Sequence, residues 1–441
     1  MQSVIESRKA FYRLAALTGE QRNELLSKML EALAQHRETI LTANKLDITD
    51  AETAVATGDI SKSLFKRLDL SEAKFDGLLS GVSAVRELPD PLDISNYSQQ
   101  MTEGLSLYRV TCPIGVIAVI FEARPEAAVQ ITSLCIKSGN AVLLKGGKEA
   151  RRSNAALVEA MRSALPDDLK EAVQLIESRE AVSDLLKQDK YIDVIIPRGS
   201  SELVRYIKSN TLIPVLGHAD GICHTYVHTS ADIAKAVKLV IDAKTQYPAV
   251  CNATETLLID EAVASELLSS LVPLLIAKQV TLKLCLQSIL LCEPGPFIQA
   301  SIAEDYDTEW CDLTLSVKVV TDVTEAVDHI NTHGSHHTDC IVAEDRLAAD
   351  VFMRRVDSAG VYCNASTRFA DGFRYGFGAE VGVSTGKLHS RGPMGLEGLT
   401  TVKYKLYGDG HTVGEHGSKL ERCHKAISSC KIFIKMSKCL K

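Results

Sequence analysis

Apolar and polar residues follow a helical spacing from residue 1 to about residue 88. Thr18 and Gln21 fit a capping box, in which each side chain satisfies a backbone N–H at the start of a helix. Leu26, Met29 and Leu33 then recur at the spacing of one helix face. A second helical stretch is expected over residues 63–88. The whole region is therefore predicted to be a helical scaffold.

From about residue 113 onward, short apolar runs alternate with helical stretches. Strands are expected at residues 115–121, 141–144, 173–176 and 193–196, with helices at 126–138, 153–165 and 201–209. A second region, from about 231 to 395, has a helix at 231–246 and strands at 256–259, 289–292, 316–320 and 340–342. This alternation predicts parallel, doubly wound sheets, which bind ligands at the carboxyl ends of their strands.

Two stretches outside this pattern alternate with the period of a strand. They are residues 97–111 and residues 400–407, and a Gly-Asp-Gly turn follows the second. The two stretches are predicted to pair into an arm, although they lie far apart in the sequence. Exposed edges of such strands often serve contacts between subunits.

Composition narrows the class of protein. An apolar fraction of 46% and a charged fraction of 24% are typical of a soluble globular chain. No apolar run reaches transmembrane length, the N-terminus does not resemble a signal peptide, and no membrane association is expected. Twelve cysteines without a secretory signal indicate reduced thiols in the cytoplasm. A net charge of −7 argues against non-specific nucleic-acid binding.

Cys251 is the candidate nucleophile. It lies in a loop between a predicted helix, which Pro248 breaks, and a predicted strand. A side chain at such a junction can point into a cleft, and Asn252 can offer an amide donor to a developing oxyanion. The alternative is that Cys251 is an inert thiol in the core.

Two glycine-rich turns with basic side chains lie where predicted strands end. They are Lys145 to Lys148, and Arg198 with Gly199 and Ser200. The GxGxxG pattern is absent, so an ordinary dinucleotide fingerprint is excluded, but a phosphate-bearing ligand is favoured.

His333, His336 and His337 are the nearest approach to a metal motif. They lie in a polar stretch without Cys or Asp at ligand spacing, and no CxxC pair occurs in the chain. We therefore expect solvated histidines and no metal.

Several motifs together resemble the gamma-glutamyl phosphate reductase family of the aldehyde dehydrogenase superfamily, over about residues 1–416. The motifs are Pro113 to Ile117, Phe121 to Pro125, Leu144 to Glu149, Val215 to Gly221, Cys251 to Ala253 and Arg391 to Leu399. The resemblance implies an α/β aldehyde dehydrogenase-like fold with two doubly wound α/β domains and a β oligomerisation arm.

The resemblance also implies domain limits. Residues 1–230 would form the NADP-binding domain, with arm strands inserted at about 95–111, and residues 231–395 the catalytic domain. Residues 396–416 would complete the arm. Residues 417–441 depart from the family as an atypical basic tail, with seven Lys or Arg against one Glu.

The implied reaction is the reduction of L-glutamyl 5-phosphate by NADPH, giving glutamate 5-semialdehyde and phosphate in proline biosynthesis. The implied roles are the nucleophile for Cys251, cofactor contacts for Lys145, Gly199, Ser200 and Glu309, and substrate contacts for Asn364, Ser366 and Arg368, with Arg124 as a further anion holder. The family resemblance also suggests a homo-oligomer, with glutamate 5-kinase as a candidate partner.

Two departures from other aldehyde dehydrogenases refine this expectation. Lys148 stands where NAD enzymes commonly carry a glutamate for the ribose 2′-hydroxyl, and an ammonium group favours NADP. Val215 stands where hydrolytic enzymes carry the glutamate that activates water. The alternatives are a hydrolytic aldehyde dehydrogenase and a catalytically silent family member.

Overall fold

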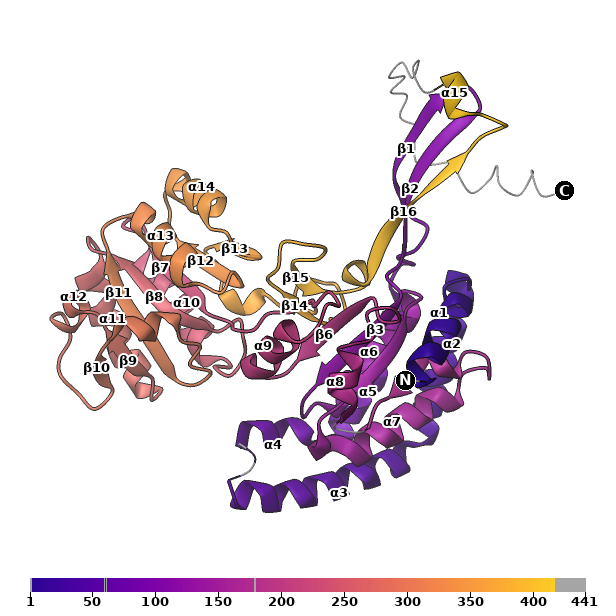
Figure 1. The fold of residues 1–441 in the computed structure, drawn as a ribbon. Coiled ribbons are helices and arrows are strands. Elements are labelled where there is room, and N and C mark those ends of the chain that lie inside the picture. The colour runs from indigo at the N-terminus through magenta and orange to yellow at the C-terminus, as the bar shows by residue number, and fades with distance from the viewer. Residues whose placement is uncertain (1, 59, 61, 178–179, 417–441) are drawn as a thin grey trace.

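The computed structural model describes residues 2–58, 60, 62–177 and 180–416, and the basic tail predicted for residues 417–441 lies outside them. Two α/β lobes lie beside each other, and a narrow β arm extends from the first lobe (Figure 1). No helix within the described residues is both long and apolar enough to cross a membrane.

Helices form most of residues 2–87, as the apolar spacing predicts. They are α1 (Gln2–Leu14), α2 (Gly19–Gln35), α3 (Arg37–Ala56), α4 (Lys62–Leu68) and α5 (Glu72–Glu87). The capping box of Thr18 and Gln21 is confirmed at the start of α2. The stretch expected at 63–88 is two helices, because Asn44 binds the backbone of Leu68 and Leu70 and stabilises a break between them.

The first lobe is built on a parallel sheet with the strand order β5-β4-β3-β6. Its strands are β3 (Val116–Phe121), β4 (Ala141–Lys145), β5 (Val173–Leu175) and β6 (Val194–Arg198). The helices between and after them are α6 (Pro125–Lys137), α7 (Arg151–Ser163), α8 (Glu180–Leu185) and α9 (Ser201–Ser209). Both predicted glycine-rich turns follow strands of this sheet, at its carboxyl edge.

The second lobe holds a seven-stranded parallel sheet in the order β10-β9-β11-β8-β7-β12-β13. The strands are β7 (Cys223–Val227), β8 (Thr254–Asp260), β9 (Thr281–Leu284), β10 (Ile298–Ala300), β11 (Thr314–Val320), β12 (Thr338–Val342) and β13 (Gly360–Cys363). The helices are α10 (Ile233–Thr245), α11 (Ala264–Ala277), α12 (Leu286–Ile289), α13 (Val323–His333) and α14 (Arg346–Arg355). The expected pair of doubly wound α/β domains is confirmed.

Two details of the second lobe differ from expectation. The strand predicted at residues 289–292 is wrong: Ser288 bonds back to Cys285 and closes the short helix α12, and Leu290 and Leu291 are exposed after it. An apolar run of this length does not distinguish strand from helix. The boundary predicted after residue 230 is also displaced, because β7 pairs with β8 and β12 of the second sheet.

The end of the predicted catalytic domain packs on the first lobe. The short strands β14 (Gly382–Ser384) and β15 (Gly392–Met394) pair with each other, and Val381, Met394 and Leu399 belong to the core of the first lobe. The chain therefore passes from the second lobe back to the first before it enters the arm.

The arm is an antiparallel sheet of β1 (Ser95–Thr102), β2 (Leu105–Pro113) and β16 (Thr400–Tyr407), with the short helix α15 (Val413–His416) at its tip. The predicted pairing of the two distant stretches is confirmed, with Tyr404 opposite Arg109. Tyr404 and Leu406 are both more than half exposed on this sheet, at 62% and 56%.

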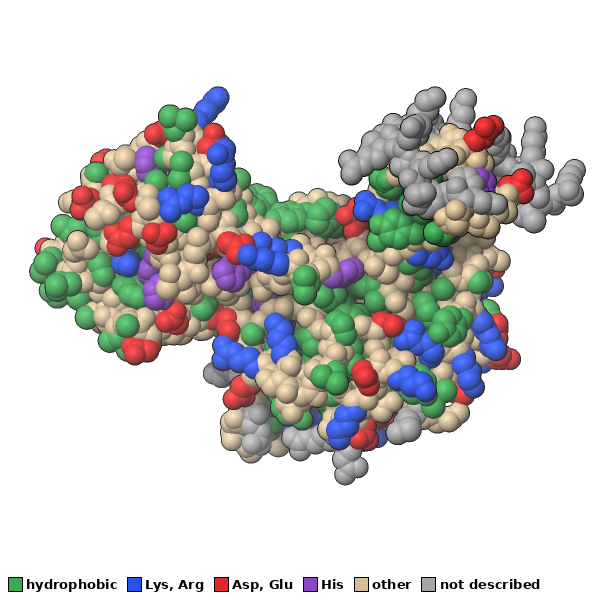
Figure 2. Space-filling view, turned by 45° about the horizontal axis from the view of Figure 1, so that its top comes forward, with side chains coloured by type: hydrophobic (Ala, Val, Ile, Leu, Met, Phe, Trp, Pro, Cys, Tyr) green, Lys and Arg blue, Asp and Glu red, His purple; other side chains and the backbone are tan. Residues whose placement is uncertain are grey.

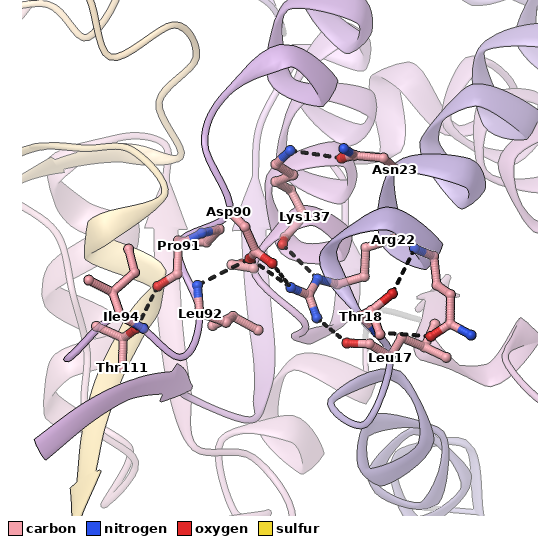
Figure 3. A network of polar contacts seen from close by, with 12 residues as sticks. Leu17, Thr18, Arg22, Asn23, Asp90, Pro91, Leu92, Ile94, Thr111 and Lys137 are labelled. Atoms are coloured by element: carbon pink, nitrogen blue, oxygen red, sulfur yellow. Dashed lines mark hydrogen bonds and ion pairs between the residues drawn. The ribbon is translucent and has the colours of Figure 1, made fainter. Parts of the chain in front are cut away.

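A network centred on Arg22 fixes the root of the arm (Figure 3). The buried guanidinium of Arg22 donates to both carboxylate oxygens of Asp90, at 2.7 and 2.8 Å, and to the carbonyl of Lys137 at 3.1 Å. Thr111, on β2, donates its hydroxyl to the carbonyl of Pro91 at 2.7 Å. Bidentate Arg–carboxylate pairs hold a defined geometry. The network therefore ties the start of the arm to α2 and α6.

Candidate active site

A cleft of about 610 Å³ separates the carboxyl edge of the first sheet from the second lobe. Figure 2 shows the two lobes joined by a narrower waist at which Lys, Arg and His side chains are visible. Five segments supply most of the lining: residues 122–124, 196–201, 216–219, 247–252 and 368–374. Groups that the sequence keeps far apart thus face one another here.

Cys251 lies in this cleft, in the loop that joins α10 to β8, as predicted. Gly221 lies directly behind it: a Cβ on Gly221 would be 2.3 Å from the carbonyl oxygen of Cys251. Only glycine permits such a close approach of two backbones. The segment from Val215 to Gly221 is therefore held against the Cys251 loop.

Two histidines flank the sulfur atom of Cys251. His337 Nε2 lies 3.2 Å from Cys251 Sγ. The His218 ring meets the His337 ring edge-on with centroids 5.1 Å apart, and its Nδ1 lies 3.0 Å from the carbonyl oxygen of Val383. A carbonyl only accepts, so Nδ1 of His218 carries the proton and Nε2 is left for the sulfur.

These neighbours shift the acid–base balance of the thiol. Burial opposes the thiolate of Cys251, but the charges of His337 and His218 and their hydrogen bonds to sulfur hold its pKa well below the usual range. Burial likewise opposes a charge on His218, yet the Cys251 thiolate and the Val383 carbonyl raise the pKa of His218 to about 9. The arrangement favours a thiolate–imidazolium pair, which is the reactive form of a cysteine nucleophile.

The expectation that the clustered histidines are solvated is wrong for His337, which is fully buried. His333 pairs with Asp307 and His336 bonds to the carbonyl of Asp357, and none of the three histidines is among the residues that line the cleft. His337 differs because it immediately precedes β12, whose side chains are all buried. Its position beside a predicted strand was the one feature of the sequence that could have indicated its burial. His218 was missed as well, although it lies within a family motif.

Asn252 lines the cleft beside Cys251, but part of its hydrogen-bonding capacity is already used. Its Nδ2 donates to the carbonyl of Ala370 at 2.9 Å, while Oδ1 is buried without a partner among the described residues. One amide hydrogen is left. The oxyanion role of Asn252 stays a prediction that depends on that hydrogen.

Five arginines line the cleft: Arg67, Arg124, Arg198, Arg368 and Arg374. Within the described part of the chain, no ion pair joins any of them to a carboxylate. Burial lowers the pKa of Arg124 and Arg368, and in each case neighbouring arginines lower it further. Carboxylates also line the cleft, on Glu122, Glu309, Asp371 and Glu380, but none of them forms an ion pair with these arginines within the residues described. The guanidinium groups can therefore bind an anion with more than one negative charge.

The cleft also carries three of the predicted cofactor residues. Ser200 caps α9, and its backbone N–H donates to Glu122 at 2.8 Å. A Cβ on Gly199 would lie 2.4 Å from a carboxylate oxygen of Glu122 and 2.8 Å from the side chain of Leu203, so a larger residue at that turn would require these side chains to shift. Glu309 faces the same cleft, and burial raises its pKa. The turn leaves room for a phosphate-bearing cofactor at the start of α9.

Lys145 and Lys148 are not among the residues lining this cleft. Lys145 Nζ bonds to the carbonyl of Gly146 at 2.7 Å, at the end of β4. Lys148 borders a second hollow of about 890 Å³ between α3 and α7, together with Arg151 and Glu177. Both lysines lie at the carboxyl edge of the first sheet, where β3 separates the end of β4 from the end of β6 that leads to Gly199. An extended dinucleotide could contact both places.

Asn364 and Ser366 support the site without lining it. The side-chain amide of Asn364 bonds to both backbone groups of Ala343. The buried hydroxyl of Ser366 accepts from the backbone N–H of Arg368, at the start of a short helical turn. These contacts set the loop that carries Arg368, whose Nε donates to Gln246 at 3.0 Å. Direct substrate contact by Asn364 and Ser366 stays a prediction.

Val215 packs against the core of the first lobe and does not line the cleft, whereas His218 of the same segment does. The position where the sequence predicted a missing glutamate therefore lies outside the lining of the cleft. The group nearest to the sulfur from this segment is an imidazole.

Comparison with known proteins identifies relatives that agree on one family. A family model described as the aldehyde dehydrogenase family matches residues 2–300. The chain is 51% identical over 423 residues to a probable gamma-glutamyl phosphate reductase of Schizosaccharomyces pombe, with 94% of each chain covered. It is 51% identical over 409 residues to gamma-glutamyl phosphate reductase 1 of Synechocystis, with 92% of each covered. The crystal structure of gamma-glutamyl phosphate reductase from Thermotoga maritima matches at 38% identity and a TM-score of 0.88, over 93% of this chain and 99% of that one.

Proposed function

This chain belongs to the gamma-glutamyl phosphate reductases of the aldehyde dehydrogenase family, and from that premise we propose that it reduces L-glutamyl 5-phosphate with NADPH through a Cys251 thioester. The observation that carries the proposal is a cysteine between two histidines in a cleft lined by arginines that form no ion pair among the described residues. A thiolate attacks acyl phosphates, and the arginines suit a substrate with a carboxylate and a phosphate.

The first step forms one bond and breaks another. The thiolate of Cys251 attacks the C5 carbonyl carbon, and the bond from that carbon to the phosphate oxygen breaks. The remaining amide hydrogen of Asn252 would stabilise the tetrahedral oxyanion, an effect of about 3 kcal/mol for one donor. Arg124 and Arg368 hold the charges of the substrate while the sulfur approaches.

The thiol proton has a defined destination in this scheme. While sulfur is a thiolate, His218 holds the proton, because the negative charge beside it raises its pKa. Thioester formation removes that charge, so the pKa of His218 falls as the phosphate leaves. The imidazolium can then protonate the departing phosphate trianion to the dianion. Charge and protons balance without any other acid.

The second step needs a bound cofactor and little more from the protein. The chemistry that bound NADPH supplies is a hydride for the thioester carbon. Gly199 and Ser200 would take the phosphates, Glu309 the nicotinamide ribose, and Lys145 and Lys148 the adenosine side. The first lobe is then the NADP-binding domain and the second lobe the catalytic domain. When the tetrahedral adduct collapses, Cys251 leaves as a thiolate and His218 recovers a proton from water.

We extend the proposal to the pathway, the compartment and the partners of the enzyme. The product aldehyde places the reaction in the second step of proline biosynthesis from glutamate. All nine cysteines of the described residues are free thiols, which suits a cytoplasmic enzyme. The exposed Tyr404 and Leu406 of the arm suit a homo-oligomer. Glutamate 5-kinase remains the candidate partner, since the acyl phosphate it makes is labile.

The test is the reverse reaction in phosphate-free buffer. We expect glutamate 5-semialdehyde, supplied as pyrroline-5-carboxylate, to reduce NADP only when phosphate is added, with arsenate able to replace it. An equal rate without phosphate would identify a hydrolytic aldehyde dehydrogenase and overturn the proposal. Absence of any NADP reduction with phosphate present, in a folded protein, would favour a catalytically silent family member.

A further inference from the structure

Cys251, His218 and His337 also have the composition and the spacing of a metal-binding group. One ligand atom from each residue lies within 4.8 Å of the other two. We infer that these three side chains bind a thiophilic divalent cation, of which Zn²⁺ is the representative, and that the bound ion blocks the nucleophile. The inference concerns binding to the protein itself and does not depend on the substrate of the enzyme.

The distances suit zinc with little rearrangement. Zinc binds sulfur at about 2.3 Å and imidazole nitrogen at about 2.0–2.1 Å, so a tetrahedral ion separates these ligand atoms by about 3.5 Å. Cys251 Sγ and His337 Nε2 are already 3.2 Å apart. A small opening of the pair would admit the ion. The fourth position would face the cleft, where a water molecule can complete the tetrahedron.

The non-coordinating nitrogens of both histidines are already held. Nδ1 of His218 lies 3.0 Å from the carbonyl of Val383, and Nδ1 of His337 lies 3.0 Å from the hydroxyl of Thr338. Metal-ligating histidines almost always have such a partner, which fixes the ring and its tautomer. Both rings are therefore oriented with Nε2 toward the sulfur before any metal arrives.

Ligand type, more than local charge, decides which cation binds. Arg198 and Arg368 act electrostatically on His218 and Cys251 and oppose a cation there, whereas Glu309 and Glu380 favour it. Thiolate and imidazole ligands select zinc and cobalt, while Mg²⁺ requires oxygen ligands. We therefore expect Zn²⁺ to bind and Mg²⁺ not to bind.

The three members stand at positions 218, 251 and 337, and only His337 belongs to a stretch that was considered as a metal motif in the sequence. Spacing rules for metal motifs apply to ligands on one loop or helix, and here three separate segments meet in space. The consequence is competition: an ion on the sulfur and an acyl group on the sulfur exclude each other.

The experiment is a titration of the full-length protein with Co²⁺ in a non-chelating reductant. We expect one bound ion and a thiolate-to-cobalt charge-transfer absorption, which Zn²⁺ displaces and Mg²⁺ does not. The absorption should vanish in Cys251→Ser, and affinity should fall more than about tenfold in His218→Asn and in His337→Asn. The matched controls are Cys311→Ser, a second thiol lining the cleft, and His333→Asn, and both should bind like the wild type.

Circular dichroism of each variant separates loss of a ligand from loss of fold. Persistence of the absorption in Cys251→Ser, or its loss in Cys311→Ser, would overturn the inference. So would the absence of any absorption in the wild type. A stoichiometric amount of Zn²⁺ should also stop phosphate-dependent NADP reduction, and a chelator should restore it. Because the cobalt spectrum needs no substrate, the metal site and the proposed reaction can fail separately.

Discussion

The contact between His337 and Cys251 makes a quantitative prediction about thiol reactivity. Replacing His337 by Asn removes an imidazole whose Nε2 lies 3.2 Å from Sγ. Two unit charges at that distance interact by about 5 kcal/mol at an effective dielectric constant of 20. Both His337 and His218 stabilise the thiolate, so we assign about half of this energy to His337. The amide of asparagine restores about 1 kcal/mol as a hydrogen-bond donor.

The net loss is about 1.5 kcal/mol, which raises the pKa of Cys251 by about one unit. The direction follows from the sign of the charge: the thiolate loses a positive neighbour, so deprotonation requires a higher pH. Alkylation by iodoacetamide follows the thiolate fraction. The rate should therefore be about tenfold lower in His337→Asn below the midpoint of the pH profile, and equal to the wild type well above it.

The assay is the rate of Cys251 alkylation between about pH 4.5 and pH 10, with the modified peptide identified by mass spectrometry. His333→Asn is the control, because His333 lies at the end of α13 and pairs with Asp307, outside the cleft. The double variant His218→Asn with His337→Asn should shift the midpoint further than either single variant. Identical midpoints in the wild type and the double variant would refute the thiolate–imidazolium pair.

Four further predictions address separate parts of the protein. Cys251→Ala should abolish turnover but leave NADPH binding intact by calorimetry; substantial turnover in the folded variant would exclude Cys251 as nucleophile. Lys148→Glu should weaken NADPH far more than NADH in the same assay, and equal effects would mean that Lys148 does not meet the 2′-phosphate. Arg124→Met should raise the KM for phosphate in the reverse reaction by about 10–100-fold, the loss of one charged hydrogen bond, with an unchanged KM arguing against anion binding. Lys244→Met should lower the free energy of unfolding in urea by about 3 kcal/mol, because the buried Glu255, 2.5 Å from Lys244 Nζ, loses its ion-pair partner. The control is the same variant carrying Glu255→Gln as well, in which the loss of stability should be smaller.

The sequence predicted those parts of the fold that depend on local pattern. The parallel strands β3, β4 and β6 and the arm strand β16 were found from apolar runs and from alternation. The prediction at residues 289–292 failed because a short apolar run has no period that separates helix from strand. There the outcome depended on Ser288 and Cys285, whose contacts are specific to the folded chain.

The residues of the candidate site also divide into those that a local sequence pattern could predict and those that it could not. Cys251, Gly199 and Ser200 could be predicted because a helix–loop–strand junction and a strand-end turn are visible in the sequence. His218 and His337 were missed because they come from separate segments and meet only when the two lobes form. Asn364 and Ser366 were placed in the correct loop, yet their side chains bond to backbone groups, which no sequence pattern reveals.

The position of His218 also changes the reason why phosphate, and not water, should receive the acyl group. Val215 was expected to prevent hydrolysis by the absence of a base, but it is partly buried against the core of the first lobe, and in the proposed mechanism His218 would supply a base beside the thioester. Selectivity must then come from binding. In the proposed mechanism the arginines would concentrate phosphate dianion next to the thioester, and they would not favour uncharged water. By microscopic reversibility, if His218 protonates the leaving phosphate in one direction, it deprotonates the attacking phosphate in the other. The arginines and His218 would therefore act on the same ligand. Removal of the arginines should lower the preference for phosphate over water more than it lowers the reactivity of the Cys251 thiol.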